Sequence, residues 1–245
     1  MKIKYFIIII LIIFGVSCSS ARKKPQSKES ARILKMEENN ENYFTAYDPW
    51  EPFNRRVYYF NAKFDEYIFL PVVETYKYVT PNFIETGVHN FFGNLSEIKT
   101  FINSSLQLKA KKSLVTFNRF AINSTFGIFG VFDLASQVGL ERYKEDFGQT
   151  LAYYGVKPGP YLILPLLGPS TLRDATGLGV DTIVQNYADP LKLGEASRND
   201  PEFLASNSID SRSNVEFRYY RTGTPFEYEY LRFLYIKIRE IQGQN

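Results

Sequence analysis

Cysteine, histidine and tryptophan each occur only once in this 245-residue chain, as Cys18, His89 and Trp50. A single cysteine excludes both a disulfide within the chain and a thiolate metal cluster, and one histidine argues against a zinc site. A Ser-His-Asp triad would have to use His89, although a lone histidine on a helix is far more often structural. The sequence also has no G-x-S-x-G elbow, no P-loop and no complete dinucleotide fingerprint. We therefore expect no enzyme, no metal and no cofactor.

Neither sign of charge dominates, and no run of 18 apolar residues follows the first 17 residues. Removing residues 1–17 takes away Lys2 and Lys4 and no acid, which lowers the net charge from +3 to +1. Such a balance does not indicate a nucleic-acid partner, and no ordinary transmembrane helix is expected. Aromatic residues are abundant instead, with 21 Phe and 18 Tyr. Tyrosine favours places where one end of the side chain is apolar and the other is wet.

The first 17 residues are typical of an export signal. Lys2 and Lys4 precede an almost unbroken run of Ile, Leu and Phe over residues 5–14, which suits a signal peptide and is short for a bilayer span. Small residues then lead to Cys18, where a lipoprotein signal peptidase would cut. We predict a signal peptide over 1–17 and acylation of Cys18, with palmitate among the attached fatty acids. A plain signal peptide or an N-terminal membrane anchor is the alternative.

Residues 18–42 are polar and charged, and we interpret them as a lipidated tether that binds anionic headgroups or simply stays soluble.

Residues 43–245 are predicted to form one helical domain. Asp48-Pro49-Trp50-Glu51 has a capping acid and a proline typical of a helix start. Apolar residues at helical spacing continue from residue 53 to 68 and from 84 to 124. Further helices are predicted over 145–154 and to begin at Thr171, Asp200 and Thr224.

The fold class predicted from these patterns is all-α, because no strong strand alternation and no repeat is present. Several helices combine an aromatic face with a charged one, which suits helices lying in a membrane interface as well as an aromatic-rich soluble core. A lipoprotein hydrolase with paired carboxylates is a rival hypothesis. Its candidates, each of which could equally be a helix cap or a surface charge, are Asp133, Glu141, Asp146, Asp174 and Asp181.

Three ordered blocks carry a family resemblance: DPWEPFNR at 48–55, FNRFAINSTFGIFGVFDLA at 117–135 and EDFGQTLAYYGVKPGPYLILPLLGPSTLRD at 145–174. Together they resemble the MlaA family, also called VacJ lipoproteins, and the resemblance covers nearly the whole mature chain. Gly15 before the lipidated cysteine and Lys157-Pro158 in the third block depart from the family pattern. The signature residues in the first block are Asp48, Pro49, Glu51, Asn54 and Arg55.

The resemblance implies a ring-like helical protein, anchored by its lipid and embedded in the outer membrane mainly from the periplasmic side. Such proteins maintain lipid asymmetry by passing stray outer-leaflet phospholipids to a soluble periplasmic lipid carrier, and they associate with trimeric porins. Phospholipid is then cargo and not a cofactor. Ser19 after the lipidated cysteine is compatible with sorting to the outer membrane. A structural outer-membrane scaffold remains the other alternative.

Two further hypotheses concern local segments. Gly155, Lys157, Pro158, Gly159 and Pro160 form a loop that two glycines could hinge and two prolines could stiffen, so the loop could gate a lipid path. An ordinary tight turn between two helices is the alternative.

Basic residues of the C-terminal segment could dock the carrier through charge complementarity; they are Arg218, Arg221, Arg232, Lys237 and Arg239.

Overall fold

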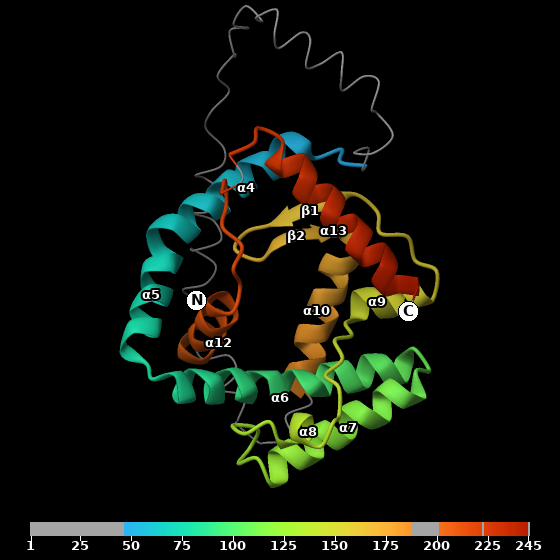
Figure 1. Ribbon diagram of the computed structural model, residues 1–245. Coiled ribbons are helices and arrows are strands. Elements are labelled where there is room, and N and C mark those ends of the chain that lie inside the picture. Colours follow the sequence, from blue (N-terminus) through green and yellow to red (C-terminus); the bar gives the residue numbers. More distant parts are fainter. Residues whose placement is uncertain (1–46, 188–200, 222, 245) are drawn as a thin grey trace, which may run out of the picture. The chain divides into compact units, whose positions relative to one another are not determined.

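The computed structural model groups residues Phe44–Asn245 into one compact unit and describes residues 47–187, 201–221 and 223–244 of it (Figure 1). The predicted signal peptide, the tether and Cys18 lie outside the described residues. The helices are α4 (Glu51–Phe64), the π-helix η1 (Asp65–Phe69), α5 (Leu70–Val79), α6 (Asn82–Leu106), α7 (Ala110–Thr125), α8 (Leu134–Gln137), α9 (Phe147–Tyr153), α10 (Leu172–Tyr187), α12 (Pro201–Ser213) and α13 (Glu227–Gln244).

One short antiparallel hairpin interrupts this helical fold, formed by β1 (Tyr161–Leu164) and β2 (Gly168–Thr171). The all-α fold class is confirmed, but the sequence analysis missed these two strands. The reason is local: Tyr-Leu-Ile-Leu is apolar at all four positions, so it has no alternation to detect. Alternation exists only in the burial, since Tyr161 and Ile163 are buried whereas Leu162 and Leu164 are half-buried.

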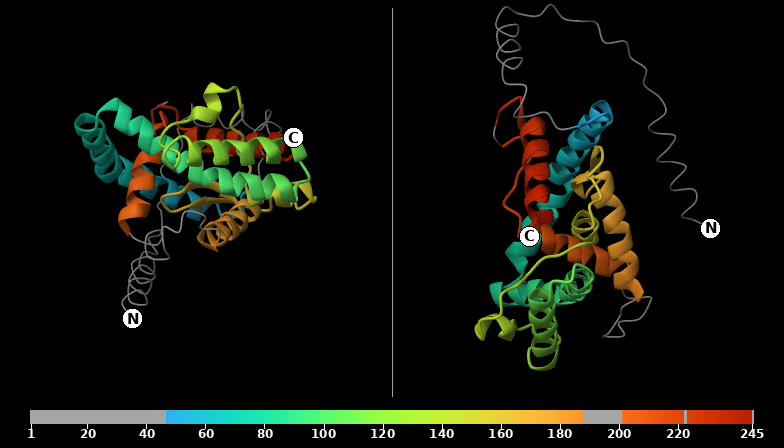
Figure 2. Two further views of the ribbon diagram at one scale, coloured as in Figure 1. Left: turned by 90° about the horizontal axis from the view of Figure 1, so that it is seen from below. Right: turned by 90° about the vertical axis from the view of Figure 1, so that its right-hand side faces the viewer.

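The element contacts close a ring within the unit, as predicted (Figure 1). α4 continues through η1 into α5, and α5 contacts α12. α12 contacts α6, α6 contacts α10, and α10 contacts the hairpin, whose first strand contacts α4 and completes the circuit. α7 lies alongside α6 (Figure 2), while α13 packs on β2 and α9.

The helix starts fall close to the predicted positions, with two corrections. α4 begins at Glu51 with Trp50 as N-cap and no side-chain cap bond, because the carboxylate of Asp48 is engaged elsewhere. α13 begins at Glu227 and not at Thr224. The capping box predicted at Thr171 is confirmed, since its hydroxyl accepts the backbone N–H of Asp174 at 3.2 Å.

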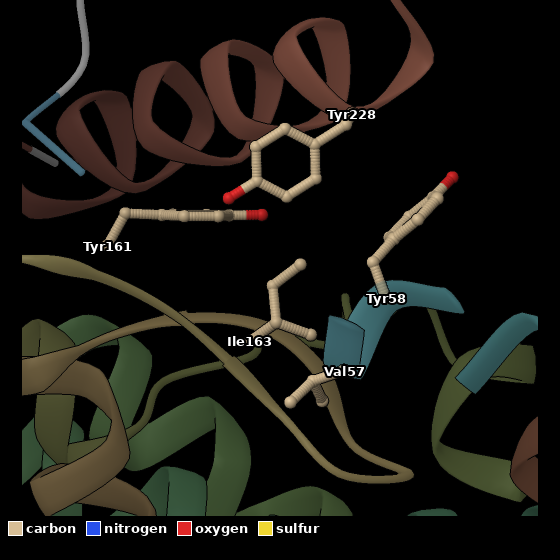
Figure 3. Close-up of a cluster of buried hydrophobic side chains, with 5 residues drawn as sticks. All are labelled: Val57, Tyr58, Tyr161, Ile163 and Tyr228. Carbon is tan, nitrogen blue, oxygen red and sulfur yellow. The ribbon is translucent and has the colours of Figure 1, made fainter. Parts of the chain in front are cut away.

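The small apolar core gathers three tyrosines around β1: Tyr161 on the strand, Tyr58 on α4 and Tyr228 on α13 (Figure 3). The ring of Tyr228 meets those of Tyr58 and Tyr161 edge to face, with centroids 5.9 and 6.2 Å apart. The hydroxyl of Tyr58 donates to Glu227 and that of Tyr228 to Asp48. Burial, helped by these carboxylates, raises the pKa of both phenols, so Tyr58 and Tyr228 supply apolar bulk while their hydroxyls stay hydrogen-bonded.

Candidate functional site

This unit has an inverted burial pattern: polar side chains lie inside and apolar side chains lie outside, the reverse of a water-soluble protein. Among the described residues, 24 polar or charged residues are buried but only 9 apolar ones, while 38 large apolar side chains are exposed. Soluble monomers rarely expose extended apolar patches, and charged residues are almost never buried unless they are paired. The arrangement therefore fits an apolar environment outside and hydrogen-bonded polar contacts between the elements.

The interface of α6 and α7 is the clearest example. Arg119 on α7 is fully buried and donates from Nε to Glu97 of α6 at 2.8 Å and from Nη2 to Asp133 at 3.0 Å. Burial raises the pKa of Glu97, although Arg119 and Arg142 oppose the rise. Burial alone would also raise the pKa of Asp133, but hydrogen bonds from Ser136 and other groups outweigh it and lower that pKa to about 2. A buried charge cluster thus fastens the helical hairpin.

A second polar cluster joins α13 to α9 and α10. The guanidinium of Arg239 donates to Asp146 at 2.7 and 2.8 Å and to Asp174 at 2.9 and 3.0 Å. Burial opposes ionisation of the two carboxyls, but Arg239, helped by Gln149 at Asp146 and by Arg173 at Asp174, outweighs it and lowers the pKa of both. The C-terminal helix is therefore fixed to the ring through charged contacts.

The residues of the first signature block converge on β1 and α13. Asn54 is fully buried; its amide donates to the carbonyl of Tyr161 at 3.0 Å and accepts the N–H of Ile163 at 2.9 Å. Asp48 accepts from Asn54 at 2.8 Å and from Arg232 at 3.0 Å. Asn54 thus bonds the backbone of β1 in addition to the partner strand β2.

The other two charged residues of the signature pair at the start of α4. Arg55 donates to Glu51 at 2.8 Å and also to Glu229 of α13. The desolvation of Arg55 opposes its charged form, but the two glutamates outweigh it and raise its pKa. Pro49 precedes the helix and lies in an exposed turn.

The loop of the gate hypothesis joins α9 to β1, a strand and not a helix. Gly155 and Gly159 have φ of +84° and +70°. Backbone N–H groups at the start of α10 donate to the carbonyls of Pro158 and Pro160, each at 3.1 Å, and Arg173 donates to the carbonyl of Val156 at 3.3 Å. Proline holds φ near −65°, so a proline at either glycine would break this turn and not stiffen it. A swing of the loop would have to break these three hydrogen bonds.

A cavity of about 340 Å³ lies between η1, the turn of the hairpin and the segment after α12. Phe64 and Phe69, Leu166 and Leu167, and Phe217 contribute aromatic and aliphatic walls. The Asp65–Arg212 ion pair, at 2.7 and 2.8 Å, is the charged part of the lining. π-Helical turns such as η1 occur frequently at functional sites, and the size falls at the low end of small-molecule cavities, about 300–1,000 Å³.

Comparison with known proteins assigns the family. The family model described as MlaA lipoprotein matches residues 46–242. The chain belongs to the MlaA lipoprotein family. It is 42% identical over 175 residues to "Uncharacterized protein RP093" of Rickettsia prowazekii (strain Madrid E), which covers 71% of this chain and 68% of that relative. It is 39% identical over 134 residues to "Intermembrane phospholipid transport system lipoprotein MlaA" of Escherichia coli (strain K12), 53% of each chain.

A solved structure described as "Structural basis for maintenance of bacterial outer membrane lipid asymmetry" superimposes with a TM-score of 0.65 at 28% identity. The match covers 81% of this chain and 100% of that one. The ring fold of this MlaA family member therefore agrees with that of a structurally characterised protein. None of the helices in the described ranges is both long and apolar enough to cross a bilayer.

The residues weighed for catalysis take structural positions in the MlaA fold. His89 contacts the buried carboxylate of Asp210 at 3.1 Å and so ties α6 to α12. Asp133 and Asp146 cap α8 and α9, and Asp181 accepts the N–H of Phe147 at 3.0 Å. Glu141 is exposed. Groups of three or more potential metal ligands are absent from the described part of the chain.

The docking hypothesis for the C-terminal helix needs correction. Arg232 and Arg239 were expected on a docking surface, but both point into the unit and pair with acids of other elements. Arg232 and Arg239 are seven residues apart and so share one face of α13, but helical spacing does not show what that face meets. The exposed basic residues of this region are Arg221 before the helix and Lys237 on it, whereas Arg218 is half-buried.

Proposed function

We propose that this chain is an outer-membrane lipoprotein that maintains lipid asymmetry by moving mislocalised phospholipids from the outer leaflet to a soluble periplasmic lipid carrier. The inverted burial is the observation that carries the proposal, because an apolar exterior over a polar interior suits a protein embedded in lipid. Membership of the MlaA family and the names of the related proteins support the same function. Acylation at Cys18 would supply the anchor, and a trimeric porin would be a membrane partner.

The charged headgroup is the main energetic obstacle to moving a phospholipid out of the outer leaflet. Moving a charged group through hydrocarbon without partners costs several kcal/mol or more. A ring built on polar contacts lowers this barrier if the head passes its inner side while the tails stay in hydrocarbon. The cavity beside η1 has the right chemistry for the tails: its walls are aromatic and aliphatic, and the Arg212 guanidinium is occupied by Asp65 and by the carbonyls of Val215 and Phe217. No covalent step is required.

Complementation in Escherichia coli lacking its MlaA lipoprotein tests the proposal. Expression of this chain should lower the phospholipid exposed in the outer leaflet, measured by surface labelling of whole cells. A scaffold without transport activity would localise to the membrane and leave the exposed phospholipid unchanged. A hydrolase would lower exposed phospholipid but produce lysolipid or free fatty acid, which mass spectrometry detects.

We also propose that the loop over residues 155–160 gates the lipid path, with its hydrogen bonds to α10 holding the closed state. The variant Arg173→Gln removes the bond to the Val156 carbonyl but retains a polar side chain. If the loop is a gate, the variant should transfer lipid faster in the complementation assay. An unchanged rate at normal expression would support the ordinary turn.

A further inference from the structure

A separate pocket of about 410 Å³ opens between the first turns of α6 and the loop that follows α7. Its lining is entirely apolar and comes from two segments: Phe83, Ile84, Gly87, Val88 and Phe91 on α6, and Val131 and Phe132 on the loop. Gly87 lets the two segments approach, because a Cβ there would lie 3.0 Å from Cγ1 of Val131. The pocket is distinct from the cavity beside η1, with which it shares no lining residue.

The loop wall holds an unfavourable backbone. Ile128, Phe129 and Gly130 are consecutive left-handed residues, with φ of 50°, 55° and 96°. This region is rare for a bulky residue and a genuine outlier for a β-branched one. Such strain persists only where the surroundings over-determine it, and it is concentrated at functional sites.

Two asparagines of α6, the half-buried Asn90 and the fully buried Asn94, hold the loop in this conformation. Asn90 donates to the carbonyl of Val131 at 3.1 Å, and Asn94 donates to the hydroxyl of Ser124 at 2.9 Å. Gly130 sits directly on Asn94, since a Cβ there would lie 2.4 Å from that of Asn94. The polar layer beneath the loop therefore fixes a turn whose large side chains face outward.

Large apolar side chains of the two segments that form the pocket are exposed. They are Phe83, Ile84, Phe126, Ile128, Phe129 and Phe132. Of these, Phe83, Ile84 and Phe132 line the pocket. Phe126, Ile128 and Phe129 lie on the segment that leads from α7 to the loop wall, the last two in its strained turn.

The apolar lining of the pocket indicates which kind of molecule can bind there. A peptide segment would bring backbone N–H and C=O groups that need partners, yet the pocket side chains are all apolar and the carbonyl of Val131 already accepts from Asn90. A hydrocarbon chain needs no such partner. We propose that this pocket binds one acyl chain of a membrane phospholipid. The inference rests on the proposed function, since it assigns a subsite for the same lipid.

Photo-crosslinking tests the assignment directly. The full-length lipidated protein is placed in vesicles of phosphatidylethanolamine and phosphatidylglycerol that include a phosphatidylethanolamine with a diazirine in the middle of one acyl chain. Label should appear on peptides that contain Phe83–Phe91 or Val131–Phe132. The variant Val88→Trp places an indole in the pocket, and labelling of these peptides should fall about tenfold, equivalent to about 1.4 kcal/mol of binding free energy.

Two further variants keep the test decisive. Leu114→Trp adds the same ring at an exposed site on α7 outside the pocket lining and should leave labelling unchanged. If Val88→Trp does not fold, Ile84→Gln at the exposed edge introduces a polar group and should lower labelling in the same way. Label confined to other peptides, or unchanged in the pocket variants, would overturn the inference even if complementation succeeds. Pocket variants that lose a protein partner without any change in labelling would also overturn it. Failure of the wild-type chain to complement would instead count against the proposed function.

Discussion

Removing the guanidinium of Arg119 is the most informative single perturbation of the fold. Its side chain is fully buried and is the common partner of Glu97, Asp133, Ser136 and the backbone carbonyl of Leu140. Arg119→Ala leaves the Glu97 carboxylate, which is 1% exposed, with only Arg142 at 3.4 Å. Removing one partner of a buried ion pair costs about 3–5 kcal/mol. For a chain of this size that corresponds to a loss of about 6–20 °C in melting temperature.

The stability lost in Arg119→Ala should also depend on pH, and the direction follows from the pKa of Glu97. Without Arg119 the pKa of Glu97 rises further above its value in the unfolded chain. The folded variant then holds a proton that the unfolded chain releases, so its stability falls as pH rises above the unfolded pKa. The loss relative to wild type should therefore be larger near pH 8 than near pH 5.

Thermal unfolding followed by circular dichroism in detergent micelles measures both effects. Arg56→Ala, which removes an exposed arginine from α4, is the matched control and should change the free energy of unfolding by less than about 0.5 kcal/mol. If Arg119→Ala costs less than about 1 kcal/mol, the value of an exposed ion pair, the cluster does not fasten α6 to α7 as described here.

Three other outcomes are expected. Asn54→Leu leaves a buried N–H and a buried C=O of β1 unpaired and should destabilise the unit by about 2–5 kcal/mol in the same unfolding assay; a loss within the control range contradicts the bridging role. Because Arg239 lowers the pKa of Asp146 and Asp174, their stabilisation is complete above the unfolded pKa near 4 and is lost as pH falls. Arg239→Gln should therefore flatten the fall in melting temperature between about pH 6 and pH 3, and an unchanged acid profile would reject that account. Cys18→Ala should abolish metabolic labelling with a fatty acid, and label retained on the variant would refute the lipidation site.

The sequence predicted where the amphipathic helices lie, but not which of their faces is buried. Helical spacing located α4, α6 and α7, because residues three and four apart share a face whatever that face meets. The same spacing could not say that the face of α7 that is buried is the polar one, with Thr116, Arg119 and Asn123. An amphipathic helix has the same pattern in water and in lipid, and only the packed structure shows which side is inside.

The sequence by itself determined the elements that depend on neighbouring residues: the apolar segment before Cys18, the break at Thr80-Pro81, the capping box at Thr171 and the turn at Gly155. Tertiary structure decided what depends on distant partners. β1 pairs with β2 in a local hairpin, but the remaining backbone groups of Tyr161 and Ile163 are bonded by Asn54, more than a hundred residues earlier. Asp48 leaves the helix start because Arg232 and Tyr228 of α13 take its carboxylate. Local signals report short-range hydrogen bonding and spacing, whereas the ring closes through ion pairs and amide contacts between residues that only folding brings together.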